Sequence, residues 1–132
     1  MKKYISALLV LVLLVTTAAF ASESLSFKTK SGQYGKTVTE KNTSTGTSGS
    51  VTVISNPNGH SMYYQIHKAN GGAATVYRNT TGTGTYSLSY NKDGNGNSLG
   101  RNGYEYRLRV AHRRQCKCEE GTKVTVEVDF KP

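Results

Sequence analysis

Short runs in which apolar and polar residues alternate fill the chain from residue 25 onward, and Gly, Asn, Ser and Thr separate them. Because successive side chains of a β-strand point to opposite faces, such runs predict strands with one buried face. The clearest runs are 104–110, with Tyr, Tyr, Leu and Val at alternate positions, and 123–130, with Val, Val, Val and Phe. We predict that these two strands pair with each other as a hairpin.

Six weaker runs bring the predicted number of strands to about eight, and no segment after residue 21 has the periodicity of a helix. The weaker runs are 25–30, 34–40, 51–55, 62–68, 75–79 and 85–90. Residues that favour turns interrupt the pattern at 56–59, 70–72 and 82–84. This organisation predicts an all-β fold, a small antiparallel β-sandwich of two packed sheets.

The first 21 residues follow a different pattern. Two lysines precede an apolar run over residues 5–15, which is shorter than the roughly 20 residues of a membrane-spanning helix, and Ala-Phe-Ala at 19–21 is a small-x-small cleavage site. We interpret residues 1–21 as a secretory signal peptide of a form typical of bacteria. Residues 22–132 are then expected to form one secreted, extracellular domain, with no transmembrane segment after cleavage.

Charge and cysteine content narrow the class of protein. The whole chain has a net charge of +9, and two of its 17 basic residues lie in the leader, so 15 basic residues face 8 acidic ones in the mature domain, a net charge of +7. Such a domain is attracted to anionic surfaces, although the same charge can serve only to keep a Gly-, Ser- and Thr-rich protein soluble. Two cysteines form too few crosslinks to stabilise the fold, so an apolar core must stabilise it.

The two clearest runs resemble part of a known architecture. Gly-Tyr-Glu-Tyr-Arg-Leu-Arg-Val at 103–110 and Lys-Val-Thr-Val-Glu-Val at 123–128 are similar to the last two strands of immunoglobulin-like and fibronectin-like sandwiches. The resemblance implies that Tyr104 or Tyr106 hydrogen-bonds back to the backbone. The distant cysteine pair and the core tryptophan of immunoglobulin domains are absent, and architecture of this kind does not determine function.

Nearly all of the excess positive charge falls between residues 101 and 118, where six basic residues accompany one acid, Glu105. Arg side chains bind phosphate, sulfate and carboxylate groups through paired hydrogen bonds, so an anionic polymer is the expected partner. The predicted binding residues are Arg101, Arg107, Arg109, Arg113, Arg114 and Lys117.

The arrangement of this patch follows from the strand period. If the strand continues beyond residue 110, its outer face carries Arg107, Arg109 and Arg113, while His112 and Arg114 follow the inner row past the edge of the core. Exposed rings such as Tyr63 and Tyr77 can stack on sugars or bases if they lie nearby. The alternative is a solvated strand face, whose charges pair with acids such as Glu127 and Asp129 on a neighbouring strand.

Cys116 and Cys118 are separated by a single residue. In an extended strand their Cα atoms lie near the upper limit for a disulfide, so a direct bond between them requires a kink and is strained. We favour this intrachain disulfide. Intermolecular disulfides, unpaired thiols and a metal site shared with His112 and another histidine are the alternatives, and the close spacing of the cysteines makes the metal signal weak.

Asp93, Asn95 and Asn97 match the first three oxygen ligands of an EF-hand calcium loop. The match then fails, because Ser98 occupies the position of the turn glycine and Tyr104 that of the bidentate glutamate. A Gly- and Asn-rich hairpin loop without an ion explains the same residues, and we favour it.

We find no nucleophile elbow, zinc-protease motif or phosphate-binding glycine loop in the sequence. The sequence therefore predicts a secreted protein that is not an enzyme, uses no cofactor or metal, and binds an anionic cell-envelope or extracellular polymer rather than a specific nucleic acid. The alternatives are a bacteriocin-like antimicrobial protein and a structural component of a matrix or coat. Neither the receptor nor the oligomeric state is indicated by the residues.

Overall fold

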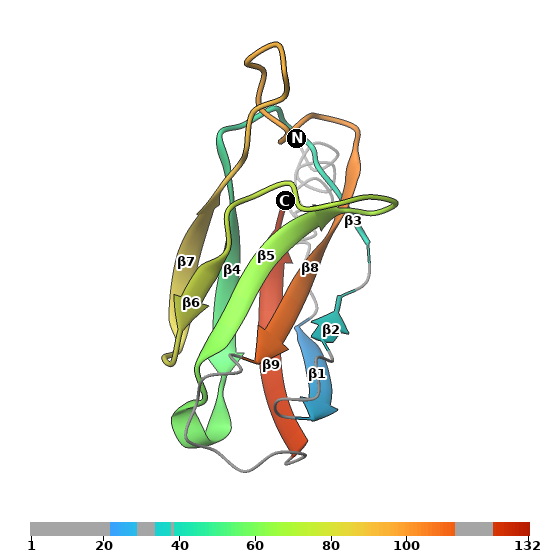
Figure 1. The fold of residues 1–132 in the computed structure, drawn as a ribbon. Coiled ribbons are helices and arrows are strands. Elements are labelled where there is room, and N and C mark those ends of the chain that lie inside the picture. The colour runs from blue at the N-terminus through green and yellow to red at the C-terminus, as the bar shows by residue number, and fades with distance from the viewer. Residues whose placement is uncertain (1–21, 29–33, 38, 113–122) are drawn as a thin grey trace, which may run out of the picture.

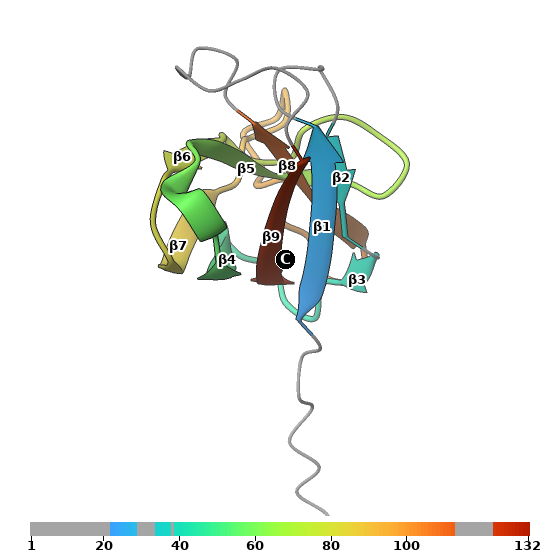
Figure 2. The ribbon, with the colours of Figure 1, turned by 90° about the horizontal axis from the view of Figure 1, so that it is seen from below.

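The computed structural model describes residues 22–28, 34–37, 39–112 and 123–132, and these form two antiparallel sheets packed face to face (Figures 1 and 2). The predicted all-β sandwich is thus confirmed. The strands in the described part of the chain are β1 (Glu23–Lys28), β2 (Tyr34–Lys36), β3 (Glu40–Lys41), β4 (Ser48–Ser55), β5 (Met62–Lys68), β6 (Arg78–Thr80), β7 (Gly84–Ser89), β8 (Glu105–His112) and β9 (Lys123–Lys131), with a 3-10 turn, η1 (Pro57–Gly59), between β4 and β5.

The two clearest strands belong to different sheets. The four-stranded sheet has the order β1-β9-β4-β7, and the five-stranded sheet has the order β2-β8-β5-β6, with β3 also paired to β8. Figure 2 shows β8 and β9 in opposite layers. The predicted hairpin is therefore wrong. Two strands with the same apolar alternation can bury their apolar rows either side by side or from opposite sides of a core, and the alternation is identical in both cases.

This pairing also limits the resemblance to immunoglobulin-like domains, in which the last two strands lie in one sheet. Here β8 is hydrogen-bonded to β2, β3 and β5, whereas β9 is hydrogen-bonded to β1 and β4. The architecture is a β-sandwich, as predicted, but its last two strands are hydrogen-bonded to other strands and not to each other.

Two strand boundaries differ from the predicted ones at places where a threonine hydroxyl, and not a backbone carbonyl, accepts the hydrogen bond from the neighbouring strand. The predicted strand 34–40 is divided into β2 and β3 around Thr37, whose Oγ1 accepts a hydrogen bond from the backbone N–H of Leu108 at 2.9 Å. In the same way, Thr75 precedes β6, and its Oγ1 accepts a bond from the N–H of Ile66 at 3.0 Å. A threonine hydroxyl thus competes with the backbone carbonyls for the N–H groups of the neighbouring strand, and this interrupts the regular hydrogen-bond ladder of the sheet.

Apolar rows from both sheets fill the space between them. Burial of each large aliphatic or aromatic side chain contributes about 1.5–3 kcal/mol to stability. The predicted inward residues of 123–130 are all buried, and the core consists of Leu25, Val51, Val53, Met62, Tyr64, Ile66, Ala74, Leu88, Tyr90, Tyr106, Leu108, Val110, Val124, Val126, Val128 and Phe130. The polar residues that alternate with this core form the two outer faces of the sandwich.

The predicted signal peptide, residues 1–21, lies outside the described residues. Among the residues that are described, no helix has the length and apolar character needed to cross a membrane.

Candidate binding surface

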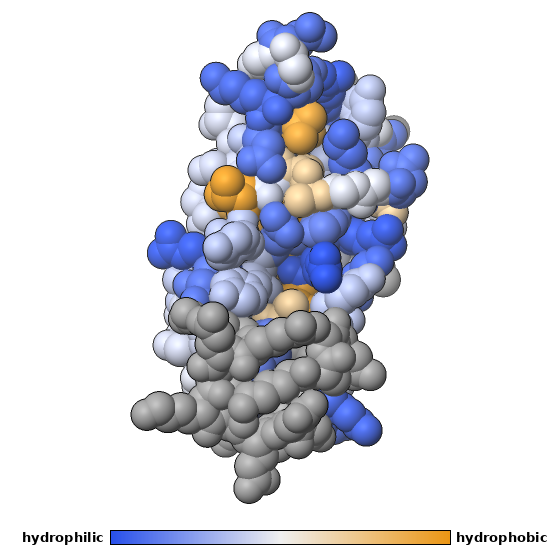
Figure 3. Space-filling model, in the orientation of Figure 1, coloured by the Kyte–Doolittle hydropathy of each residue, from blue (hydrophilic) through white to orange (hydrophobic). Residues whose placement is uncertain are grey.

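The outer face of the five-stranded sheet combines basic and aromatic side chains. We call it the Arg–Tyr face, and it consists of Tyr34, Lys36, Tyr63, Gln65, His67, Tyr77, Arg107, Arg109 and Ala111. Figure 3 shows this side of the molecule, whose central surface is mostly hydrophilic with small apolar patches. Three strands and the segment before β6 therefore contribute to one surface.

The register of β2, β8 and β5 fixes which side chains of the Arg–Tyr face are neighbours. Residues that are paired across adjacent strands have Cβ atoms about 4.5–5.5 Å apart. The rows are Tyr34–Ala111–Tyr63, then Lys36–Arg109–Gln65, then Arg107–His67. A small alanine thus separates two tyrosines, and an arginine lies between a lysine and a glutamine.

A pocket of about 330 Å³ opens on this face and is lined by Tyr63, Gln65, Tyr77, Arg109 and Ala111. The rings of Tyr63 and Tyr77 meet edge to face, with centroids 5.1 Å apart and an interplanar angle of 80°. The predicted rings therefore do lie beside one of the predicted arginines. The pocket has aromatic walls with one guanidinium group among them.

Tyr34 orders the cations on the other side of this pocket. The guanidinium carbon of Arg109 lies 3.9 Å from the centroid of the Tyr34 ring, and the Lys36 ammonium lies 5.0 Å from the same centroid. Both contacts have cation–π geometry, which is worth about 0.5–1 kcal/mol at an exposed site. The ring thus holds the Arg109 guanidinium in place next to the pocket.

Arg107 and Arg109 have no acidic partner among the described residues. Each has a buried Nε atom without a hydrogen-bond partner there, and their cross-strand neighbours are neutral or basic. Pairing with Glu127 and Asp129, the alternative expected from the sequence, is wrong, because those acids lie on β9 in the other sheet. Glu105 is exposed on the same strand and is paired in register with Lys41. The Arg–Tyr face therefore has a net positive charge.

His67 contributes little to that charge. Gln65 donates from Nε2 to the carbonyl of Thr75 at 2.9 Å, so its Oε1 faces His67 Nε2, also at 2.9 Å, and the histidine nitrogen is the donor. Burial, and then the charges of Arg109, Lys36 and Arg107, lower the pKa of His67 below its ordinary value of 6.5, against a backbone hydrogen bond with Gly71 that raises it. The neutral imidazole is therefore the form favoured at neutral pH.

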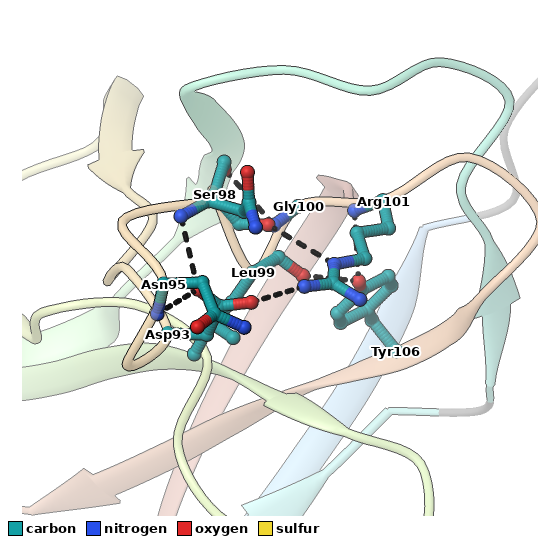
Figure 4. A network of polar contacts seen from close by, with 8 residues as sticks. Asp93, Asn95, Ser98, Leu99, Gly100, Arg101 and Tyr106 are labelled. Carbon is teal, nitrogen blue, oxygen red and sulfur yellow. Dashed lines mark hydrogen bonds and ion pairs between the residues drawn. The ribbon is translucent and has the colours of Figure 1, made fainter.

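Arg101 is not in the paired rows of the Arg–Tyr face but in the loop before β8, beside Asp93 and Tyr106 (Figure 4). Its Nη2 forms an ion pair with Asp93 Oδ2, while Asp93 Oδ1 accepts bonds from the backbone N–H groups of Asn95 and Asn97, both at 2.9 Å. The Asn97 N–H, and then that of Asn95 and the Arg101 charge, hold the pKa of Asp93 below its usual value despite some desolvation. Asp93 organises a hairpin loop, and its carboxylate is already bonded within that loop.

Tyr106 anchors the same loop to the core. Its hydroxyl donates to the carbonyl of Leu99 and accepts from the N–H of Arg101 at 3.0 Å, whereas the Tyr104 side chain is 55% exposed. The backbone hydrogen bond implied by the resemblance is therefore present, and it belongs to Tyr106. This bond fixes the loop that holds Arg101.

The remaining predicted site residues, Arg113, Arg114 and Lys117, lie outside the described residues, as do Cys116 and Cys118. His112, expected past the edge of the core, is instead buried at 6% exposure, and its Nε2 lies 3.4 Å from Nδ1 of His60. Within the described ranges no group of three or more His, Cys, Asp and Glu side chains could hold a metal ion.

Several members of the Arg–Tyr face were not identified from the sequence: Tyr34, Lys36, Gln65, His67 and Ala111. The strand period does place Gln65 and His67 on the same face as Tyr63. Recognising them as neighbours of Arg107 and Arg109 requires the pairing of β5 with β8. No feature of the local sequence indicates that pairing.

Comparison with known proteins found no matching family model, no matching curated protein and no matching solved structure. Function is therefore inferred from the residues of the Arg–Tyr face.

Proposed function

We propose that this protein is a secreted, non-enzymatic binding protein whose Arg–Tyr face recognises an anionic cell-envelope or extracellular polymer. One observation carries the proposal: Arg107, Arg109 and Lys36 lie together on one sheet face, and no described acid forms an ion pair with them. The side chains that line the pocket are tyrosine, glutamine, arginine and alanine, a set suited to contact and hydrogen bonding with a ligand.

Electrostatics explains why a polyanion is the favoured partner. Three cations on one face repel one another, and burial of the two Nε atoms removes water that would otherwise solvate them. An incoming carboxylate, sulfate or phosphate group accepts charge-assisted hydrogen bonds from the guanidinium groups, each worth about 1.5–3 kcal/mol. A polymer repeats such groups and so can meet all the cations at once.

The test compares equal losses of charge on opposite sides of the sandwich. One variant carries Arg107→Gln and Arg109→Gln, and the matched control carries Lys28→Gln and Lys123→Gln, which are exposed and paired in register on the other sheet. Binding of the purified protein to bacterial cell walls, wall polyanion and acidic polysaccharide is measured over a salt series. We expect salt-sensitive binding that the arginine variant loses and the lysine control keeps.

Two outcomes would contradict the proposal. Absence of binding by the unaltered protein would exclude an anionic polymer as its partner. Equal weakening of binding in both variants would show that net charge, and not the Arg–Tyr face, is responsible. Killing of neighbouring bacteria would favour the antimicrobial alternative, and reducible multimers on a gel would favour the matrix alternative; we expect neither.

A further inference from the structure

We infer that the pocket between Tyr63 and Tyr77 holds one acidic sugar residue, a hexuronate, of the bound polymer. This inference rests on the proposed function, because it specifies the ligand of the same surface. It assigns separate roles to the aromatic walls, to Ala111 and to Arg109.

Ala111 creates the hollow. It is paired in register with Tyr34 on one side and Tyr63 on the other, so a methyl group stands between two large rings. A larger residue at this position would fill the space that Tyr63, Tyr77 and Arg109 surround. At about 330 Å³ the pocket is at the lower end of the range for ligand sites, which suits a single sugar unit better than an extended segment.

The two tyrosines form a corner rather than a slot. Their rings are inclined at 80°, and Tyr77 is 64% exposed, so both present surface to a ligand. A nucleic acid base is flat and stacks best on a parallel ring, whereas a pyranose is thick and puckered, with apolar C–H groups on more than one side. The corner therefore matches a sugar ring more closely than a base.

Arg109 and Gln65 supply the polar contacts. The Arg109 guanidinium is held against Tyr34, and a carboxylate has the two oxygens that its donors bind in parallel. Gln65 Nε2 has two hydrogens, and its bond to the Thr75 carbonyl uses one of them. The second is available to a sugar hydroxyl. A linear phosphate polymer would use the arginine but leave the aromatic corner without a partner.

The experiment tests the contribution of the pocket to binding separately from that of the positive charge. Ala111→Leu fills the hollow and leaves every cation in place, and Tyr77→Ala removes one exposed wall, which keeps the test valid if the leucine variant does not fold. Tyr104→Ala, which removes an exposed tyrosine outside this pocket, is the matched control. The probes are a polygalacturonate oligosaccharide, inorganic polyphosphate of equal charge and a thymidine oligonucleotide, each titrated by calorimetry.

We expect the polygalacturonate oligosaccharide to bind most tightly. Ala111→Leu and Tyr77→Ala should each weaken its binding about tenfold or more, which corresponds to about 1.4 kcal/mol, with polyphosphate binding and the Tyr104→Ala control unchanged. Free galacturonate should compete, and galactose should compete less. Unchanged oligosaccharide affinity in both pocket variants would overturn the inference, as would tighter binding of polyphosphate or of the oligonucleotide.

The result that would contradict the proposed function differs from the one that would contradict the hexuronate assignment. If the Arg107→Gln/Arg109→Gln variant loses polymer binding but the pocket variants do not, the anionic-polymer function stands and the hexuronate assignment is wrong. If the unaltered protein binds none of the three probes and no cell-wall polymer, the proposed function itself is wrong.

Discussion

The two outer faces of the sandwich are built on the same alternation, but only the Arg–Tyr face carries buried side-chain donors without a hydrogen-bond partner among the described residues. On the four-stranded sheet, hydroxyls bond across strands: Ser26 with Thr125 at 2.8 Å and Thr52 with Thr85 at 2.9 Å. On the Arg–Tyr face, Arg107 and Arg109 have Nε atoms without partners among the described residues.

This difference indicates where a ligand is to be expected. A polar group that is already bonded within the protein gains little from a new partner, because an old bond must first be lost. A cation that has no acidic partner in the protein loses no such contact when a ligand supplies an anion, so its bond to the ligand is a larger net gain. The hydroxyl pairs therefore stabilise the four-stranded sheet, whereas the arginines are the groups at which we expect a ligand.

Charge reversal should produce the largest effect. Arg107→Glu with Arg109→Glu should lower affinity for an acidic polysaccharide by about a hundredfold or more, since two charge-assisted bonds are each worth about 1.5–3 kcal/mol. Lys28→Glu with Lys123→Glu makes the same change in net charge on the outer face of the four-stranded sheet and should lower affinity only a few-fold. Titration of each variant with the acidic polysaccharide at one salt concentration measures both affinities. Equal losses would remove the distinction between the faces.

Two buried tyrosines, Tyr106 and Tyr64, also differ in whether their hydroxyl groups have partners. We expect this difference to give the next largest effect, on stability. Tyr106→Phe loses the bonds to Leu99 and Arg101 and should lower the free energy of unfolding by about 1–3 kcal/mol. Tyr64 has a buried hydroxyl without a partner among the described residues, and burial raises its pKa, so Tyr64→Phe should be neutral or stabilising. Denaturant unfolding measures both, and an equal loss in the two variants would contradict this expectation.

A smaller effect on stability is expected on the outer face of the four-stranded sheet. Thr52→Val should lower stability by about 0.2–1 kcal/mol, because it breaks the pair with Thr85 near solvent. The double variant Thr52→Val with Thr85→Val should lose less than twice that amount, since the two residues share one bond. Strict additivity in thermal unfolding would show that the pair contributes nothing.

The pH dependence of stability should show the smallest effect. Because the pKa of His67 is lowered on folding, the unfolded chain takes up a proton first as the pH falls below 6.5. The free energy of unfolding should therefore fall between pH 6.5 and the lower folded pKa, and level off below it. His67→Gln should reduce this loss when melting temperatures at pH 8 and pH 5 are compared. An identical pH profile in both proteins would contradict the assignment.

Much of the fold follows from local pattern. The predicted strand 62–68 coincides with β5, and Gly59 adopts a positive φ of 58° in a turn that the sequence marks. The predicted inward rows of 104–110 and 123–130 are buried except for Tyr104, which precedes β8 and is 55% exposed. The site was predicted less completely. Arg107 and Arg109 lie on the outer face as expected, but Arg101 is bound to Asp93 in a loop. Its partner is eight residues earlier, on the other side of a turn whose shape depends on backbone bonds.

The sequence by itself determined which side of each clear strand is buried, because the two-residue period is a property of the extended chain. Only the tertiary structure decided which strands are neighbours, since every residue except proline carries the same backbone donor and acceptor. That choice placed Glu127 and Asp129 in the other sheet, and Gln65, His67 and Lys36 beside the arginines. The positive surface and its aromatic pocket are consequences of non-local pairing.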